Sequence, residues 1–390
     1  MKKSFLSLPL LLVAAGHLAV DLGQGALPVL LPFIRDLFGL SYTQVGIVVM
    51  VQNITSSVIQ PLFGYMIDKV YWPPLLPVSI FIAAIAMSLT GYALSYGWLL
   101  VIIVFAGLGS ACFHPQGAVA INSISDDDTR GKSMGLFSVG GNLGFALGSL
   151  FMAFLLTKLA GGLSGTIYFA IPSVTVALLL CLSLGKIPDI RKSNPGKGRA
   201  CQKNATPYLL LAILLAVIFV RSTIHTSLQT YMPLYYINYL KEDPAYAGYL
   251  VALFLFGGAC GTFIGASLSD RFGRKTIIVL SMAASMPLIA FFPHVSGLLC
   301  QLAVFLAGLA LVSSFATTLV LAQEMMPANI GVASGLTVGF SVGLGGVGTT
   351  LLGAAADHFD LPAVLLILAL MPIAGLVCAL WLPGRMFVRR

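Results

Sequence analysis

Twelve apolar segments account for most of the sequence, and each is long enough to cross a lipid bilayer as a helix. A transmembrane helix needs about 20 predominantly apolar residues, because the hydrocarbon core is about 30 Å thick. Only 9% of the residues are charged and 58% are hydrophobic, so the chain lacks the polar surface of a soluble protein. The sequence therefore predicts an all-α polytopic membrane protein with twelve transmembrane helices in a lipid bilayer. The segments lie near residues 4–34, 42–67, 73–95, 97–122, 133–157, 166–185, 207–240, 245–268, 276–293, 297–322, 331–356 and 361–382.

One longer polar segment, residues 186–206, divides the twelve segments into six and six. Its proline, glycine and basic residues are typical of a solvated linker. We expect an N-terminal six-helix bundle at 1–185, a cytoplasmic linker at 186–206 and a C-terminal six-helix bundle at 207–390. The halves also resemble each other, since Asp68 and Asp270 each end the second helix of a half. A repeat of about 200 residues with six spans per copy is the sequence trace of a duplicated transporter.

The placement of basic residues predicts the orientation. Most of the 21 Lys and Arg residues fall on one side of the membrane if the N-terminus is cytoplasmic. Cytoplasmic loops carry an excess of Lys and Arg, so we expect both termini and the linker in the cytoplasm. Membrane topology also explains the formal net charge of +8, and we expect no nucleic-acid partner.

A loop motif carries a family resemblance. Residues 266–275 read Ala-Ser-Leu-Ser-Asp-Arg-Phe-Gly-Arg-Lys, and residues 64–69 hold a shorter copy with Gly64 and Asp68. The longer copy resembles the G-x-x-x-D-R-x-G-R-K signature of the major facilitator superfamily, with alanine in place of the first glycine. The resemblance implies the major facilitator fold, in which two six-helix bundles surround a central path.

A narrower resemblance rests on two further stretches. His17 and Asp21 precede Pro28 and Pro32 in the first segment, and Phe-His-Pro-Gln-Gly occupies 113–117. Together they are similar to the fosmidomycin resistance protein family of bacterial drug exporters. This resemblance implies a bacterial inner-membrane protein that exports a drug.

Ionisable residues lie deep in two apolar segments. His17 and Asp21 are four residues apart and therefore share one face of a helix. Arg221 and His225 repeat this spacing in the seventh segment. Ionisable groups inside a membrane are costly and mark substrate or proton pathways. We expect Asp21, His17 and His114 to couple protons, and Arg221, His225 and His114 to bind an anionic substrate.

Structural alternatives accompany each of these roles. His17 and Asp21 could form a purely local pair, and an Asp21–Arg221 ion pair could simply tie the halves together. His114 precedes Pro115, and its ring could satisfy backbone carbonyls that the proline frees. Weaker polar candidates for the substrate site are Gln24, Gln229 and Asn142.

Two other groups of residues have predicted mechanical roles. Asp68, Asp270, Arg271 and Arg274 lie at predicted cytoplasmic helix ends, where we expect a charge latch rather than ordinary solvated loop charge. Small residues let membrane helices approach closely. We expect such packing along the fifth segment, which contains Gly135, Gly140, Gly141, Gly144 and Gly148.

The sequence contains no phosphate-binding loop, catalytic triad or metal-ligand spacing. We therefore expect a protein that is not an enzyme and that needs no cofactor or metal. Ion-gradient coupling remains, and an aspartate beside histidines suits protons better than sodium, because histidine titrates near neutral pH.

The function that best fits these features is proton-coupled efflux, by antiport, of a small anionic drug such as the phosphonate antibiotic fosmidomycin. Two alternatives remain. One is a proton-linked importer of an anionic metabolite on the same fold, and the other is a non-transporting membrane receptor or scaffold. We expect the protein to function as a monomer.

Overall fold

The computed structural model describes residues 7–69, 72–126, 129–159, 161–187, 208–326, 332–333 and 335–384, and all regular structure in these ranges is helical. Its contacts divide the chain into two compact units. The first comprises Met1–Gly39 and Val51–Lys197, and the second comprises Leu40–Met50 and Gly198–Arg390. Contacts assign Leu40–Met50 to the second unit, and the expected domain boundaries stay a prediction.

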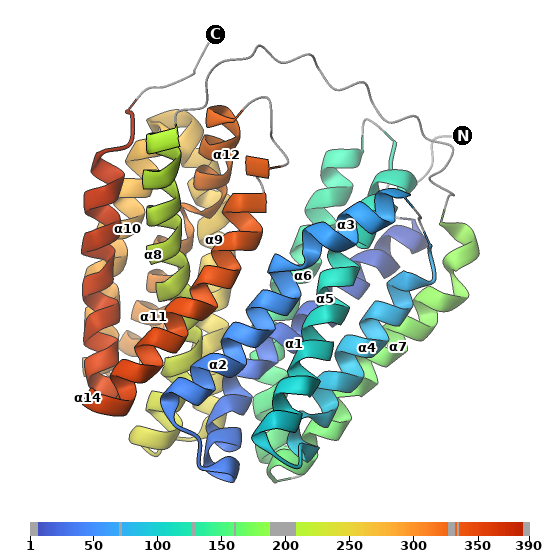
Figure 1. Ribbon diagram of the computed structural model, residues 1–390, viewed down its shortest axis with the longest axis horizontal. Coiled ribbons are helices and arrows are strands. Elements are labelled where there is room, and N and C mark those ends of the chain that lie inside the picture. Colours follow the sequence, from blue (N-terminus) through green and yellow to red (C-terminus); the bar gives the residue numbers. More distant parts are fainter. Residues whose placement is uncertain are drawn as a thin grey trace. The chain divides into compact units, whose positions relative to one another are not determined.

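The first half of the chain contains the α-helices α1 to α7, and a π-helical turn, η1, separates α2 from α3. Figure 1 shows these helices in blue to green. Within the first unit, α1 packs against α4, α5, α6 and α7, so residues on α1 can meet side chains from several helices. The elements are α1 (Leu8–Phe38), α2 (Tyr42–Asn53), η1 (Ile54–Val58), α3 (Gln60–Lys69), α4 (Leu75–Leu89), α5 (Tyr96–Ile124), α6 (Arg130–Phe154) and α7 (Ala170–Leu182).

The second half of the chain repeats this plan. Its first helix, α8, packs mainly against α14, much as α1 packs against α6. The elements are α8 (Tyr208–Pro233), η7 (Leu234–Tyr239), α9 (Pro244–Phe272), α10 (Arg274–Phe291), α11 (Gly297–Val312), α12 (Phe315–Met325), η9 (Gly335–Gly339) and α14 (Phe340–Leu380).

Eleven helices in the described ranges are long and apolar enough to cross a membrane. The last of them, Gly335–Leu380, is 46 residues long and is interrupted at Asp360, whose φ of 66° and ψ of 170° are not helical. The break separates 335–359 from 361–380, and a bilayer core needs only about 20 helical residues. The prediction of twelve transmembrane helices is therefore confirmed.

The expected close packing of the fifth segment, now α6, is confirmed at Gly140, Gly141, Gly144 and Gly148, and it is wrong at Gly135, whose added Cβ would have no neighbour within 4 Å. A Cβ atom on Gly144 would lie 2.4 Å from the carbonyl oxygen of Leu18, and one on Gly148 would lie 2.1 Å from that of Leu22. Both contacts are too short for any side chain, so the α6 backbone rests directly on α1. This packing fixes the part of α1 that carries the ionisable residues.

Candidate functional site

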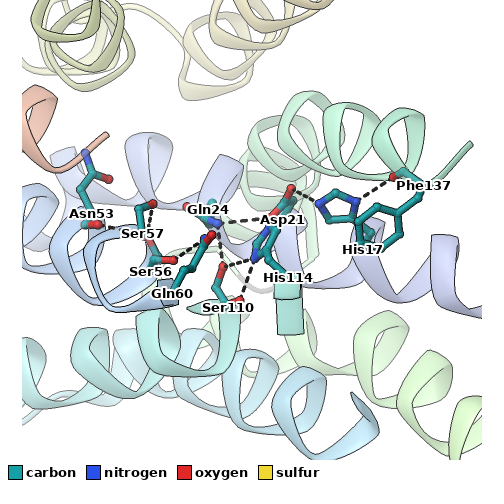
Figure 2. Close-up of polar contacts among 10 residues, drawn as sticks. All are labelled: His17, Asp21, Gln24, Asn53, Ser56, Ser57, Gln60, Ser110, His114 and Phe137. Atoms are coloured by element: carbon teal, nitrogen blue, oxygen red, sulfur yellow. Dashed lines mark hydrogen bonds and ion pairs between the residues drawn. The ribbon is translucent and has the colours of Figure 1, made fainter. Parts of the chain in front are cut away.

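Asp21 lies in α1 between two imidazole rings (Figure 2). Its Oδ2 is 3.2 Å from Nε2 of His17, one helical turn earlier, and its Oδ1 is 3.2 Å from Nε2 of His114 on α5. The Asp21 side chain is 5% exposed, and those of His17 and His114 are 11% and 21% exposed. The structure thus brings together the three residues that the sequence proposed for proton coupling, which we call the Asp21 cluster.

Backbone carbonyls orient both rings of the cluster. Nδ1 of His17 donates to the carbonyl oxygen of Phe137 on α6 at 2.7 Å. The His17 ring also stacks on the Phe137 ring, with centroids 4.0 Å apart. Nδ1 of His114 donates to the carbonyl oxygen of Ser110 at 2.7 Å. Because a carbonyl oxygen only accepts, each Nδ1 carries a hydrogen and each Nε2 faces Asp21.

Gln24 belongs to the same network. Its Nε2 donates to Oδ1 of Asp21 at 3.2 Å and to Oγ of Ser110 at 2.8 Å. Gln24 therefore connects α1 to α5 beside the carboxylate. Its predicted role in substrate binding stays a prediction.

A glycine of α6 leaves the space that the cluster occupies. A Cβ on Gly141 would lie 2.6 Å from Nε2 of His17 and 2.7 Å from Oδ2 of Asp21. Both distances are far below ordinary van der Waals contact. Helix α6 thus acts on the cluster in two ways. Phe137 supports the His17 ring, and the absence of a side chain at position 141 leaves room for the His17–Asp21 contact.

The π-helical turn η1, which packs on α5, is a buried polar element that the sequence reasoning missed. Thr55 and Ser56 are buried there, and a Cβ on Gly107 of α5 would lie 1.9 Å from Oγ1 of Thr55. Gln60 donates through Nε2 to the carbonyl oxygen of Ser56 at 2.7 Å, and Figure 2 shows this turn with Gln24 and Ser110. The signal in the sequence was the run of polar residues within an apolar segment at 52–60. π-helical turns are frequent at functional sites.

Arg221 is the buried cation of the second unit. The residue is 3% exposed on α8, and its guanidinium carbon lies 4.9 Å from the ring centroid of Phe315. Its Nε has no hydrogen-bond partner among the described residues, and no ion pair to Arg221 occurs among them. The structure thus contains a buried guanidinium that is only partly compensated, by a cation–π contact. The suggested Asp21–Arg221 ion pair would join different units and stays untested.

His225 and Gln229 continue this face of α8. Nε2 of Gln229 is 3.0 Å from Nδ1 of His225, and the His225 ring lies 5.5 Å from the ring of Phe254. Asn142, by contrast, is exposed on α6, and no hydrogen bond joins it to the Asp21 cluster within the described residues. The substrate-binding roles of all three remain predictions.

The predicted latch has a partner that sequence reasoning missed. Arg274 donates to Glu324 of α12 through Nε at 2.9–3.0 Å and through Nη2 at 2.6 Å, whereas its Nη1 is 3.6 Å from Oδ1 of Asp270. Arg271 lies over the ring of Phe272 at 5.2 Å. The side chain of Asp68 and residues 188–206 of the linker lie outside the described residues. Glu324 had no local motif to mark it, because its role depends on the packing of α10 against α12.

His17, Asp21 and His114 also have donor atoms within 4.8 Å of one another, which is compatible with a metal ion. The carboxylate, however, offers a separate oxygen to each imidazole at a hydrogen-bonding distance. The role of the cluster in proton coupling stays a prediction.

Comparisons with known proteins agree on one family. The family model described as Major Facilitator Superfamily matches residues 13–347 and 243–388. The chain is 32% identical to the MFS-type transporter YfnC of Bacillus subtilis (strain 168), over 95% of this chain and 92% of the relative. It is 30% identical to the fosmidomycin resistance protein of Escherichia coli (strain K12), over 94% and 90%. A more distant relative is the probable nitrate transporter NarT of Staphylococcus epidermidis, 25% identical over 72% and 70%.

Solved structures show the same fold. The nucleoside transporter NupG matches 96% of this chain and 98% of its own with a TM-score of 0.77 at 13% identity. The xylose transporter XylE from E. coli matches 97% of each chain with a TM-score of 0.72 at 14% identity. These relatives and neighbours are transporters, not enzymes. The chain therefore belongs to the Major Facilitator Superfamily and is a multi-pass membrane transporter of a small molecule.

Proposed function

We propose that this transporter exports a small anionic compound in exchange for protons, and that fosmidomycin is the first substrate to test. The observation that carries the proposal is the Asp21 cluster, a carboxylate between two imidazoles inside a membrane-spanning helix. Ionisable groups at such depth are rare and mark ion or proton pathways. Histidine is the side chain whose charge changes in the physiological pH range, so protons suit this site.

The anionic character of the substrate rests on Arg221. A buried guanidinium without a carboxylate partner is unfavourable, because burial removes its hydration without replacing it. A bound anion would supply the missing charge and hydrogen bonds. The planar fork of arginine matches phosphonate and carboxylate groups through paired hydrogen bonds. The name of the E. coli relative, fosmidomycin resistance protein, supports fosmidomycin as the compound, and export of a drug would account for resistance to it.

A second candidate is import of a small anion together with protons. The name of the staphylococcal relative, a probable nitrate transporter, supports a small anion as the substrate and leaves the direction open. Electrostatics also allows it, since a protonated Asp21 cluster no longer repels an anion. A non-transporting receptor or scaffold is the third candidate, and it leaves the Asp21 cluster and the buried Arg221 without a role.

Placement in the cell belongs to the same proposal. We place the protein in the bacterial inner membrane as a functional monomer, with both termini cytoplasmic. The distribution of Lys and Arg supports this orientation.

Inverted membrane vesicles containing the full chain test the proposal. An acidic lumen should drive fosmidomycin into vesicles that contain the protein and not into vesicles from cells that lack it. Under the import alternative, the same acidic lumen would drive preloaded compound out of the vesicles. The absence of flux in both directions, for fosmidomycin and a panel of small carboxylates and oxyanions, would favour the receptor or scaffold.

A further inference from the structure

We infer that the Asp21 cluster binds two exchangeable protons, one in each histidine–aspartate contact, and that transport couples two protons to each substrate molecule. The inference rests on the proposed function, because it takes the cluster as the coupling site. It goes further by assigning a stoichiometry and by giving His17 and His114 equal parts in proton binding.

Nδ1 of each ring holds a hydrogen in every state of the cluster. Each Nδ1 lies 2.7 Å from a backbone carbonyl oxygen, that of Phe137 for His17 and that of Ser110 for His114. Neither oxygen can donate, so both Nδ1 atoms hold a hydrogen whatever the charge of the ring. The proton that comes and goes must therefore be at Nε2 or on the carboxylate.

Each of the two contacts with Asp21 needs a proton to become a hydrogen bond. Each Nε2 is 3.2 Å from a different carboxylate oxygen. Without a proton in the contact, a nitrogen lone pair would face an oxygen lone pair, and buried polar atoms without partners are costly. One proton would satisfy one contact and leave the other unfavourable. Two protons make both contacts hydrogen bonds, so the observed geometry is that of the doubly protonated cluster.

The side chains that surround the Asp21 cluster cannot take over one of the protons. Apart from His114, the helices packed on this part of α1 present Ser110 from α5, Phe137 and Gly141 from α6, Met87 from α4 and Ser173 from α7. None of these side chains titrates in the physiological range. Gln24 is a fixed donor to Asp21. Among these contacts, the exchange of charge is thus confined to the three groups of the Asp21 cluster.

The cluster with two exchangeable protons and the cluster with none differ strongly in charge. Two imidazolium rings and one carboxylate sum to +1, whereas two neutral rings and the carboxylate sum to −1. Full discharge therefore changes the local charge by two units. At zero membrane potential, a two-proton exchanger concentrates substrate about 100-fold per unit of pH gradient, and a one-proton exchanger about tenfold.

The experiment measures the number of protons exchanged per substrate molecule, with fosmidomycin as the probe. The full chain is reconstituted into liposomes, the membrane potential is clamped at zero with potassium and valinomycin, and several pH gradients are imposed. The logarithm of the equilibrium accumulation ratio is plotted against the gradient, over a pH range where titration shows constant ionisation of the probe. The orientation of the carrier in the liposome does not matter, because the equilibrium ratio is thermodynamic.

Variants separate the two protons. Asparagine can still donate to the carbonyl that holds each ring but cannot bind a proton, so His17→Asn and His114→Asn each remove one site. Ser123→Ala is the matched control on α5, since the Ser123 hydroxyl only donates within its own helix, to Ala120. Size-exclusion chromatography verifies that each variant is folded.

We expect a slope of two for the wild type and the Ser123→Ala control, and a slope of one for either asparagine variant. A wild-type slope of one would overturn the two-proton inference and leave the proposed proton coupling intact. A wild-type slope of zero would overturn both. If neither asparagine variant folds, the wild-type slope alone decides between these outcomes.

Discussion

Substitution of Gly141 by alanine should weaken the coupling of transport to the proton gradient, because it disturbs the His17–Asp21 contact and leaves the His114–Asp21 contact in place. The added methyl group would lie 2.6 Å from Nε2 and Cε1 of His17 and 2.7 Å from Oδ2 of Asp21. Ordinary van der Waals contact begins at 3.4 Å. The His17 ring and the Asp21 carboxylate must therefore each move away from the added methyl group, by about 0.8 Å at most. The ring cannot move freely, because it is stacked on Phe137 and hydrogen bonded to its carbonyl oxygen.

The expected magnitude combines two effects. Overpacking a closely packed interior costs about 1–3 kcal/mol of stability. Loss of a hydrogen bond to a charged group costs about 1.5–3 kcal/mol, which corresponds to a loss of roughly 10- to 100-fold in the occupancy of the coupled state. We therefore expect gradient-driven uptake to fall at least tenfold, with a Tm reduced by a few degrees as the usual consequence of about 1–3 kcal/mol.

The assay compares uphill uptake with passive, gradient-free exchange of fosmidomycin in proteoliposomes. Gly135→Ala on the same helix is the matched control, because nothing lies within 4 Å of its added methyl group. It should transport like the wild type. Wild-type coupling in Gly141→Ala would refute the reasoning, since it would show that the His17–Asp21 contact is not needed in the geometry described.

Three further predictions concern other parts of the molecule. Arg221→Lys should weaken fosmidomycin binding by about 10- to 100-fold while the protein stays folded, because lysine lacks the paired donors; an unchanged Kd in purified protein would remove Arg221 from the binding site. Glu324→Gln should lower the Tm, because it replaces the carboxylate bound by Arg274, whose side chain is 23% exposed, at a cost of about 1–3 kcal/mol; an unchanged melting curve would show that the pair adds no stability. A cysteine introduced at Ser193 into a cysteine-free background should react with an impermeant thiol reagent in inverted vesicles and not in intact cells, and labelling of intact cells would reverse the proposed orientation.

The sequence was informative where local spacing decides the outcome. Segment length and hydropathy were enough to predict the twelve helices. The four-residue spacing of His17 and Asp21 was enough to place both residues on one helical face. His114 could be proposed as an unusual polar residue in an apolar segment, but its contact with Asp21 required the packing of α1 against α5.

Other features depend on tertiary contacts that no local pattern encodes. The carbonyl oxygens of Phe137 and Ser110 belong to ordinary helical residues, and only the structure shows that they orient the two imidazoles. Gly141 was one of several glycines in its helix, and its position opposite the His17–Asp21 contact could not be read from the sequence. Glu324 lies 50 residues from Arg274 in the chain, so its pairing was equally hidden.

The central claim is that Asp21 carries the proton coupling, and Asp21→Asn tests it most directly. Asparagine keeps the shape of the side chain but cannot ionise, so it removes the negative charge that holds a proton in each histidine–aspartate contact. Accumulation of fosmidomycin is measured in proteoliposomes at several imposed pH gradients, together with substrate-for-substrate exchange. Our account predicts that exchange survives and that uphill accumulation is lost at every gradient. Accumulation by Asp21→Asn in proportion to the gradient would contradict the account, because it would show that protons couple to transport without the Asp21 carboxylate.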